Sequence, residues 1–144
     1  MILSDSLCHT ATIRVSAPAR RVFDFMADGQ KLGEWSFGCW QSKAMPDGVF
    51  TGTSLLTGSS TFVRIHADAA RLQIDYAVGR SPETLTPLII ARVVPGAMMG
   101  ETDAACFLSL IVWRGTAPEE RWRQICAAHE LEMFRIRHRI ETGS

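Results

Sequence analysis

The chain has 144 residues, of which 47% are hydrophobic and 21% are charged, and its fifteen basic and fifteen acidic residues give a formal net charge of zero. This length predicts a single domain over residues 1–144, and the composition is too apolar for a disordered chain. A zero net charge gives no electrostatic attraction to nucleic acid or to an anionic membrane, so we expect no nucleic-acid partner.

The N-terminal ten residues contain neither a basic region nor an apolar run, so they predict no secretory signal. The longest apolar runs, 88–91 and 108–113, are much shorter than the ~20 residues of a membrane helix. The four cysteines Cys8, Cys39, Cys106 and Cys126 form no C-x-x-C pair, which favours free thiols in a reducing compartment. We therefore expect a cytoplasmic protein without an integral membrane segment.

The first third of the chain predicts a strand followed by two short helices. Apolar and polar residues alternate over 11–15, as in a half-buried strand. Pro18 then precedes an amphipathic stretch that ends near Asp28 and Gly29, and a second short helix is predicted over 30–34. Three aromatic residues, Trp35, Phe37 and Trp40, follow at once and are expected to pack inward.

The middle of the chain predicts strands at near-regular spacing, separated by turn residues such as Pro46-Asp47-Gly48. The expected strands cover residues 38–44, 49–56, 61–67, 72–78, 85–94 and 104–114. Consecutive strands joined by short turns pair in an antiparallel manner. The element order therefore predicts an α+β fold with an antiparallel sheet.

The last segment, from Thr116 to about Ile140, predicts a long amphipathic helix. Thr116 and Glu119 have the spacing of a capping box, and Gly143 is placed to end the helix. At 1.5 Å per residue such a helix is about 35 Å long, so a broad apolar surface must receive it. The expected inward stripe consists of Trp122, Cys126, His129, Met133, Ile136 and Ile140.

The opening of the chain resembles the helix-grip superfamily, which includes birch-pollen-allergen proteins, START-type lipid-transfer domains and the polyketide cyclase/dehydrase group. The likeness is carried by Val15-Ser16-Ala17-Pro18-Ala19-Arg20-Arg21-Val22-Phe23-Asp24-Phe25-Met26-Ala27-Asp28 and by Trp35. It implies a curved seven-stranded antiparallel sheet gripping the C-terminal helix, with two short helices after the first strand and a cavity for hydrophobic molecules. Only Gly48 and Gly52 stand where the plant allergen branch has a glycine-rich loop, so the ligands of that branch are not implied.

The candidate ligand-binding residues are aromatic, apolar or cationic side chains on the elements that would surround such a cavity. Aromatic residues line binding pockets, but they also fill solid cores, and both interpretations stay open. His129 lies on the inward helix stripe, where it could be a core histidine, a ligand contact or a general base. The predicted set is Trp35, Tyr76, Arg92, Trp113, His129 and Met133.

No metal site and no cofactor are expected. The pair His129-Glu130 lacks the second histidine of H-E-x-x-H, because Met133 stands at that position. Cys126 and His129 could supply only two of the four ligands of a structural zinc site.

The leading functional hypothesis is a module that binds a small hydrophobic molecule, such as a lipid or a sterol-like or aromatic polyketide-like compound. The alternative is a cyclase/dehydrase-like enzyme in which His129, Tyr76 or Arg92 moves protons, and we assign no catalytic residue from the resemblance. A third hypothesis is a protein-interaction domain of the chaperone-ATPase-activator type. The strands at 88–94 and 105–113 are apolar on both faces, which also predicts a homodimer through the outer sheet face.

Overall fold

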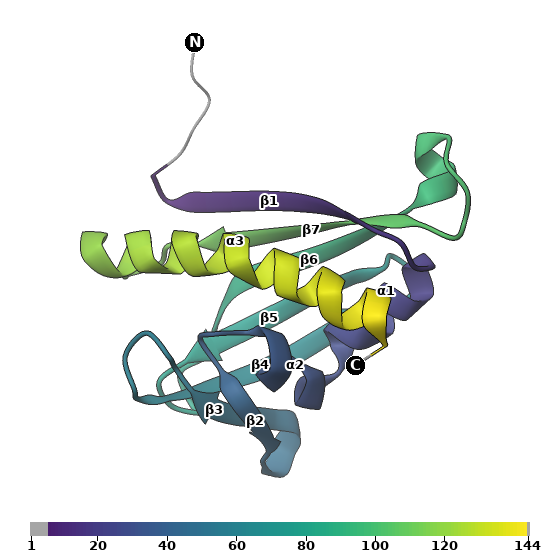
Figure 1. The fold of residues 1–144 in the computed structure, drawn as a ribbon. Helices are drawn as coiled ribbons and strands as arrows, with labels where there is room; N and C mark the ends of the chain where they lie inside the picture. The colour runs from purple at the N-terminus through teal and green to yellow at the C-terminus, as the bar shows by residue number, and fades with distance from the viewer. Residues whose placement is uncertain (1–5, 144) are drawn as a thin grey trace.

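The structure is a computed structural model, and it describes residues 6–143. The prediction that residues 1–10 contain no secretory signal concerns a stretch that lies partly outside the described residues. The first third of the described chain contains β1, α1 and α2, and the strands and α3 follow in the predicted order (Figure 1). The α+β fold class is therefore confirmed. The bounds are β1 Cys8–Val15, α1 Ala19–Ala27, α2 Gly29–Trp35, β2 Trp40–Ala44, β3 Val49–Thr53, β4 Ser60–Asp68, β5 Gln73–Gly79, β6 Thr86–Pro95, β7 Cys106–Trp113 and α3 Glu119–Thr142.

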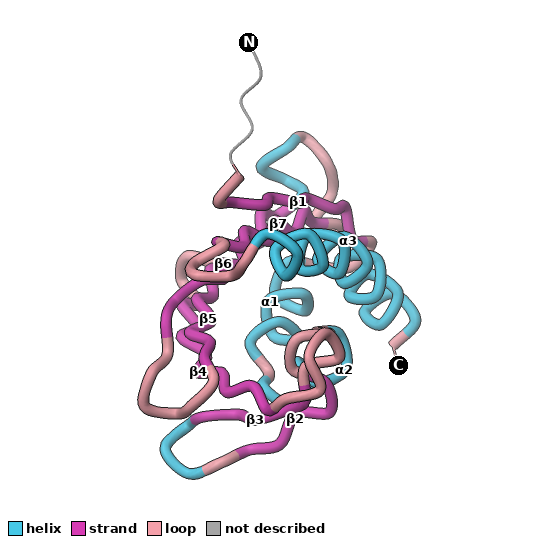
Figure 2. The backbone as a smooth tube through the Cα atoms, turned by 90° about the vertical axis from the view of Figure 1, so that its left-hand side faces the viewer, coloured by secondary structure: helices cyan, strands magenta, loops and turns pink. Residues whose placement is uncertain are grey.

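The seven strands form one antiparallel sheet in the order β1-β7-β6-β5-β4-β3-β2. The first and last strands are neighbours, with Cys8 opposite Trp113 and Val15 opposite Cys106. Figure 2 shows the sheet as an arc, with the three α-helices on its concave side. The curved sheet and the long helix on its inner side match the predicted architecture.

The concave face carries the core because alternate side chains of the central strands point inward. Tyr76 of β5, Val93 of β6 and Leu108 of β7 are fully buried there. From the helical side, Met26 of α1 and Ile136 of α3 belong to the same apolar cluster. Burial of each such side chain contributes roughly 1.5 to 3 kcal/mol, so this layer provides the main stabilisation.

α3 presents the predicted stripe to the sheet, but its first turn differs from the prediction. The buried residues on α3 are Trp122, His129, Met133, Ile136 and Ile140, while Cys126 is half-buried. The capping box is wrong: Pro118 is the N-cap, and no side chain caps the helix. Glu119 instead pairs with Arg114 at 3.1 Å and with Arg123 at 3.4 Å. Gly143 ends the helix in the left-handed conformation, as predicted.

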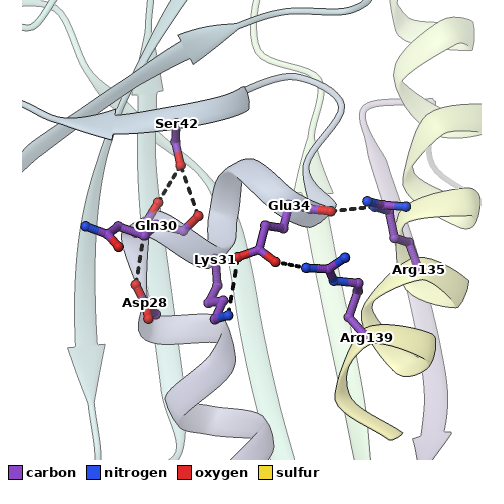
Figure 3. Close-up of polar contacts among 8 residues, drawn as sticks. Asp28, Gln30, Lys31, Glu34, Ser42, Arg135 and Arg139 are labelled. Atoms are coloured by element: carbon purple, nitrogen blue, oxygen red, sulfur yellow. Dashed lines mark hydrogen bonds and ion pairs between the residues drawn. The ribbon is translucent and has the colours of Figure 1, made fainter. Parts of the chain in front are cut away.

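Two arginines fasten the C-terminal half of α3 to α2 (Figure 3). Arg135 donates to the Glu34 main-chain carbonyl, and Arg139 bonds to the Glu34 carboxylate. Lys31 lies 3.4 Å from the other oxygen of that carboxylate. The basic residues in the last turns of α3 therefore bind a neighbouring helix as well as complementing the helix dipole.

A glycine allows α2 to lie close against β2. A Cβ added at Gly33 would meet the Ser42 backbone nitrogen at 2.0 Å, so no larger residue fits. On the same side, the Ser42 hydroxyl donates to the Gly29 carbonyl at 2.6 Å (Figure 3). This contact fixes α2, and with it Trp35, against the rim of the sheet.

The outer face of the sheet mixes apolar and polar side chains. Ile90 and Ile111 are half-buried and paired across β6 and β7, whereas Arg92 beside them is exposed. The Thr12 and Ser109 hydroxyls are hydrogen-bonded at 2.7 Å on the neighbouring strands. The homodimer therefore stays a prediction. None of the helices in residues 6–143 is long and apolar enough to cross a membrane.

Candidate functional site

A pocket of about 370 Å³ lies between the inner face of the sheet and the N-terminal half of α3. Most of the side chains around it are apolar, and the exposed ones, such as Arg80, Trp113 and Thr116, mark the side that is open to solvent. Its walls come from α2, from β4 to β7 and from α3. The apolar lining includes Leu32, Trp35, Leu56, Val63, Val78, Leu88, Ile89, Val112, Ile125 and Ala128.

Four of the six predicted ligand-binding residues border this pocket. Trp35 and Tyr76 are buried in its wall, His129 is 1% exposed on α3, and Trp113 is 44% exposed at the rim. Contact between these side chains and a ligand stays a prediction. The four residues come from α2, β5, α3 and β7, which the fold brings together.

The other two predicted residues lie outside the pocket lining. Arg92 is exposed on the outer face of β6, because its neighbours Ala91 and Val93 take the inward positions. Met133 lies one turn beyond His129 and packs into the apolar core with Ile136. Neither residue has a part in the site described below.

Tyr76 shapes the wall of the pocket. Its hydroxyl donates to the Met26 carbonyl at 2.6 Å, and its ring meets Trp35 edge-on, with centroids 6.1 Å apart. Complete burial raises the pKa of the Tyr76 hydroxyl well above its usual range. The hydroxyl proton is therefore engaged with the backbone, which argues against Tyr76 as a proton donor to a ligand.

His129 and His9 form a direct imidazole pair. The two Nδ1 atoms are 2.6 Å apart and the rings are nearly perpendicular, at 69°. His9 Nε2 lies 3.5 Å from the Glu130 carboxylate, while His129 Nε2 is buried without a hydrogen-bond partner in the described residues. Burial, together with the neighbouring His9, lowers the pKa of His129 to about 4. His129 therefore presents an uncharged ring to the pocket.

Glu132 adds a second polar group, one turn along α3 from His129. Its carboxyl accepts a hydrogen bond from the Phe37 amide at 2.8 Å and lines the pocket. Burial raises the pKa of Glu132 to about 8, against the opposing effect of hydrogen bonds from Phe37 and Ser36. At neutral pH the protonated carboxylic acid therefore predominates, and it can donate as well as accept.

Sequence reasoning missed both His9 and Glu132, although the spacing of each carried a signal. The alternation of the first strand extends back through Ala11 to His9, which places His9 on the same face as Val15. On α3 a second row at helical spacing, Arg121, Ile125, Ala128 and Glu132, borders the pocket beside the core stripe. Because Glu132 is charged, its place in this row did not lead to the prediction that it faces the pocket.

The two buried cysteines show no sign of reactivity. Cys39 and Cys106 are buried, and desolvation raises the pKa of Cys39 to about 12 and that of Cys106 to about 11. Both thiols are therefore protonated and unreactive at neutral pH. Within residues 6–143, no three His, Cys, Asp or Glu side chains are grouped as a metal site would require.

Comparisons with known proteins find relatives by structure and none by sequence. No protein-family model and no curated protein matches the chain. A START superfamily protein from Mycobacterium smegmatis is similar, with a TM-score of 0.68 and 13% identity, over 96% of this chain and 99% of that one. The Zhui aromatase/cyclase from Streptomyces sp. R1128 gives a TM-score of 0.61 and 16% identity, with 93% of each chain covered.

The di-domain aromatase/cyclase BexL from the BE-7585A biosynthetic pathway is also similar. Its TM-score is 0.69 at 17% identity, and the match covers 93% of this chain and 46% of that one. Identities this low show a shared fold and do not transfer a ligand or a reaction. The expected helix-grip fold is therefore confirmed.

Proposed function

We propose that this protein binds a small, largely hydrophobic molecule in the pocket between the sheet and α3. The observation that carries this proposal is the pocket itself, which is about 370 Å³ in volume, mainly apolar in its lining and bordered by a few polar groups. Ligand sites of globular proteins have this character and usually measure roughly 300 to 1,000 Å³. The volume lies in the lower part of that range, which favours a compact ligand.

Apolar contact supplies the affinity. A ligand that buries about 250 Å² of apolar surface gains roughly 6 kcal/mol before the costs of association are counted. Trp35 Nε1 and His129 Nε2 are both buried without a partner in the described residues. A ligand that hydrogen-bonds to either atom removes a penalty of about 1 to 3 kcal/mol. The favoured ligand therefore has an apolar body and at least one hydrogen-bonding group, as lipids, sterol-like and aromatic polyketide-like compounds have.

Neighbouring alanines on α3 provide a matched test. Ala128 lines the pocket, whereas Ala127 is exposed on the opposite side of the helix. Ala128→Phe is expected to fill the pocket and abolish binding of the fluorescent probe 8-anilinonaphthalene-1-sulfonate, while Ala127→Phe leaves it unchanged. Native mass spectrometry of the wild-type protein would reveal a co-purifying small molecule. Equal probe binding by both variants would place the probe elsewhere and remove the support for this pocket.

A cyclase-like enzyme is the second candidate, favoured by the unpartnered His129 Nε2 beside the pocket. Tyr76 and Arg92 are less suitable proton carriers than His129. The Tyr76 hydroxyl is hydrogen-bonded to the Met26 carbonyl, and Arg92 lies outside the pocket. Changing His129 to Ala separates the two functions. An enzyme loses turnover while it keeps its ligand, whereas a binder shows only a change in affinity or stability.

A protein-interaction domain remains the third candidate. It predicts that no small molecule co-purifies and that Ala128→Phe leaves partner binding unchanged. The homodimer through the outer sheet face is tested separately by analytical ultracentrifugation at micromolar concentration, where a monomer counts against it. The free cysteines agree with a reducing compartment, and we keep the cytoplasm as the proposed location.

A further inference from the structure

Three titratable groups connect the pocket to the surface of the protein. His129 Nε2 is buried at the pocket, His129 Nδ1 meets His9 Nδ1 at 2.6 Å, and His9 Nε2 lies 3.5 Å from Glu130. The exposed fraction of the side chain increases along this series, being 21% for His9 and 68% for Glu130. The series therefore leads from a dry interior to water.

The short contact between the two Nδ1 atoms requires one proton between them, because two lone pairs or two N–H groups would repel each other. If His129 holds that proton, its Nε2 is a bare acceptor on a ring that borders the pocket, and a neutral His9 carries its own proton on Nε2 beside Glu130. If His9 holds the shared proton, His129 Nε2 carries a proton instead. A proton that arrives at His129 Nε2 can thus displace the shared proton towards His9.

We propose that His129, His9 and Glu130 form a proton relay, in which His129 Nε2 takes a proton from a ligand in the pocket and the positive charge appears on His9. The bond between the ligand and its proton breaks, and a bond from that proton to His129 Nε2 forms. In the same event the shared proton moves from His129 Nδ1 to His9 Nδ1. The ligand becomes an anion, His129 stays neutral, and His9 becomes an imidazolium beside the Glu130 carboxylate.

The relay solves an electrostatic difficulty of this site. A charge on His129 itself would be buried in an apolar wall, which is unfavourable and keeps that ring a weak base. On His9 the same charge is partly hydrated and within ion-pair distance of a carboxylate. The pair can therefore act as a stronger base towards the pocket than a solitary buried histidine.

The relay rests on the proposed binding function for its ligand and specifies the class of that ligand. The ligand must bear a weakly acidic proton, as a phenol or a carbon acid next to a ketone does. Glu132, protonated at neutral pH on the same wall, is placed to donate a hydrogen bond to a developing oxyanion. The anion therefore gains a partner where it forms.

Other titratable and charged groups lie near this pair, and the design of the test must take their charges into account. On α3 they are Cys126, Glu130 and Glu132, each within one turn of His129. Elsewhere around the pocket they are Arg121, further along α3, and Cys39, Tyr76, Arg80 and Arg114 from other segments. The arginines favour an anion in the pocket, so variants of the relay must leave them in place.

Nitrogen NMR of histidine-labelled protein without ligand tests the relay directly. When the solution is acidified, the pair is expected to take up one proton and to carry the added positive charge on His9. His129 is expected to stay singly protonated, with its proton moving from Nδ1 to Nε2. A His129 ring that carries its proton on Nε2 at every pH, or that becomes doubly protonated while His9 stays neutral, would overturn the proposal.

A coloured phenol tests the ligand class. The probe is 4-nitrophenol, whose absorption distinguishes the phenol from the phenolate, and equilibrium dialysis measures its binding separately. In His9→Phe the ratio of bound phenolate to bound phenol at pH 7 is expected to fall about tenfold relative to wild type, which corresponds to one pKa unit of the probe. Glu130→Gln, a change at an exposed position that should not disturb folding, is expected to lower the ratio about threefold.

The outcomes of these experiments distinguish failure of the proton relay from failure of the proposed ligand-binding function. An unchanged ratio in both variants overturns the relay even when the probe binds. If no 4-nitrophenol binds to the wild-type protein, the proposed function and the weak-acid ligand class fail for this pocket, whereas the relay is still decided by the NMR titration.

Discussion

Replacement of Glu132 by Gln is expected to stabilise the protein at neutral pH and to have little effect in acid. The folded state raises the pKa of this carboxyl from 4.5 to about 8 because the group is buried. Between these two values the folded protein holds a proton that the unfolded chain has released, so stability decreases as the pH rises through this range. Gln cannot ionise, and its carbonyl can still accept the hydrogen bond from the Phe37 amide.

The size of the expected gain in stability follows from the difference between pH 7 and the pKa of 4.5 that the carboxyl has in the unfolded chain. One pKa unit corresponds to about 1.4 kcal/mol, which gives an upper figure of about 3 kcal/mol at pH 7. Glu132 borders the pocket, where water reaches part of the side chain. We therefore expect a gain of about 2 kcal/mol at pH 7 and nearly none at pH 4.

Urea unfolding of both proteins at a series of pH values between about 4 and 8.5 measures this difference. Glu120→Gln on the exposed side of the same helix serves as the control and should change stability by less than about 1 kcal/mol at every pH. A difference between wild type and Glu132→Gln that is the same at pH 4 and pH 8 would show that Glu132 does not titrate as described.

Three further substitutions have outcomes that follow from single contacts. Relative to wild type, His129→Phe should become about 3 kcal/mol more stable at pH 4 than at pH 6.5, because the unfolded wild-type chain binds a proton at His129 in this range before the folded protein does. Urea unfolding of both proteins at both pH values checks this difference, which excludes the opposite contribution of Glu132 because both proteins carry it. Tyr76→Phe removes the hydrogen bond to Met26 and should cost about 1 to 2 kcal/mol in thermal unfolding, and a loss near zero would contradict the bond. Glu34→Gln, which removes the partner of the partly buried Arg139, should cost about 1 to 2 kcal/mol, against less than about 0.5 kcal/mol for Asp24→Asn at an exposed ion pair.

The fold could be predicted from the sequence because its periodicities agree with the tertiary structure. The four- and three-residue steps from Trp122 to Ile140 describe the face that α3 buries, and the predicted alternation over residues 11–15 matches the burial of β1. The predicted cap of α3 was wrong. Thr116 has the right spacing to Glu119, but the carboxylate forms ion pairs with Arg114 and Arg123, which pattern alone does not reveal.

The site was less predictable because it depends on which residues meet across the fold. His9 and His129 are separated by almost the whole chain, and β1 brings them together only when it pairs with β7. Glu132 was missed because sequence patterns treat a charged residue on a helix as exposed. The charge of Arg92 favours a ligand contact, but its place between the inward-facing residues Ala91 and Val93 puts it on the outer face of the sheet.

The pairing of the first strand with the last one affects how the chain is made. β1 leaves the ribosome early, and its hydrogen-bonding edge stays unmatched until β7 has been made, about ninety residues later in the chain. The apolar inner surface of the sheet stays uncovered still longer, because α3 follows β7. Nascent chains that stall before Glu119 should consequently aggregate or depend on chaperones, whereas chains in which α3 has also emerged can close in one cooperative step.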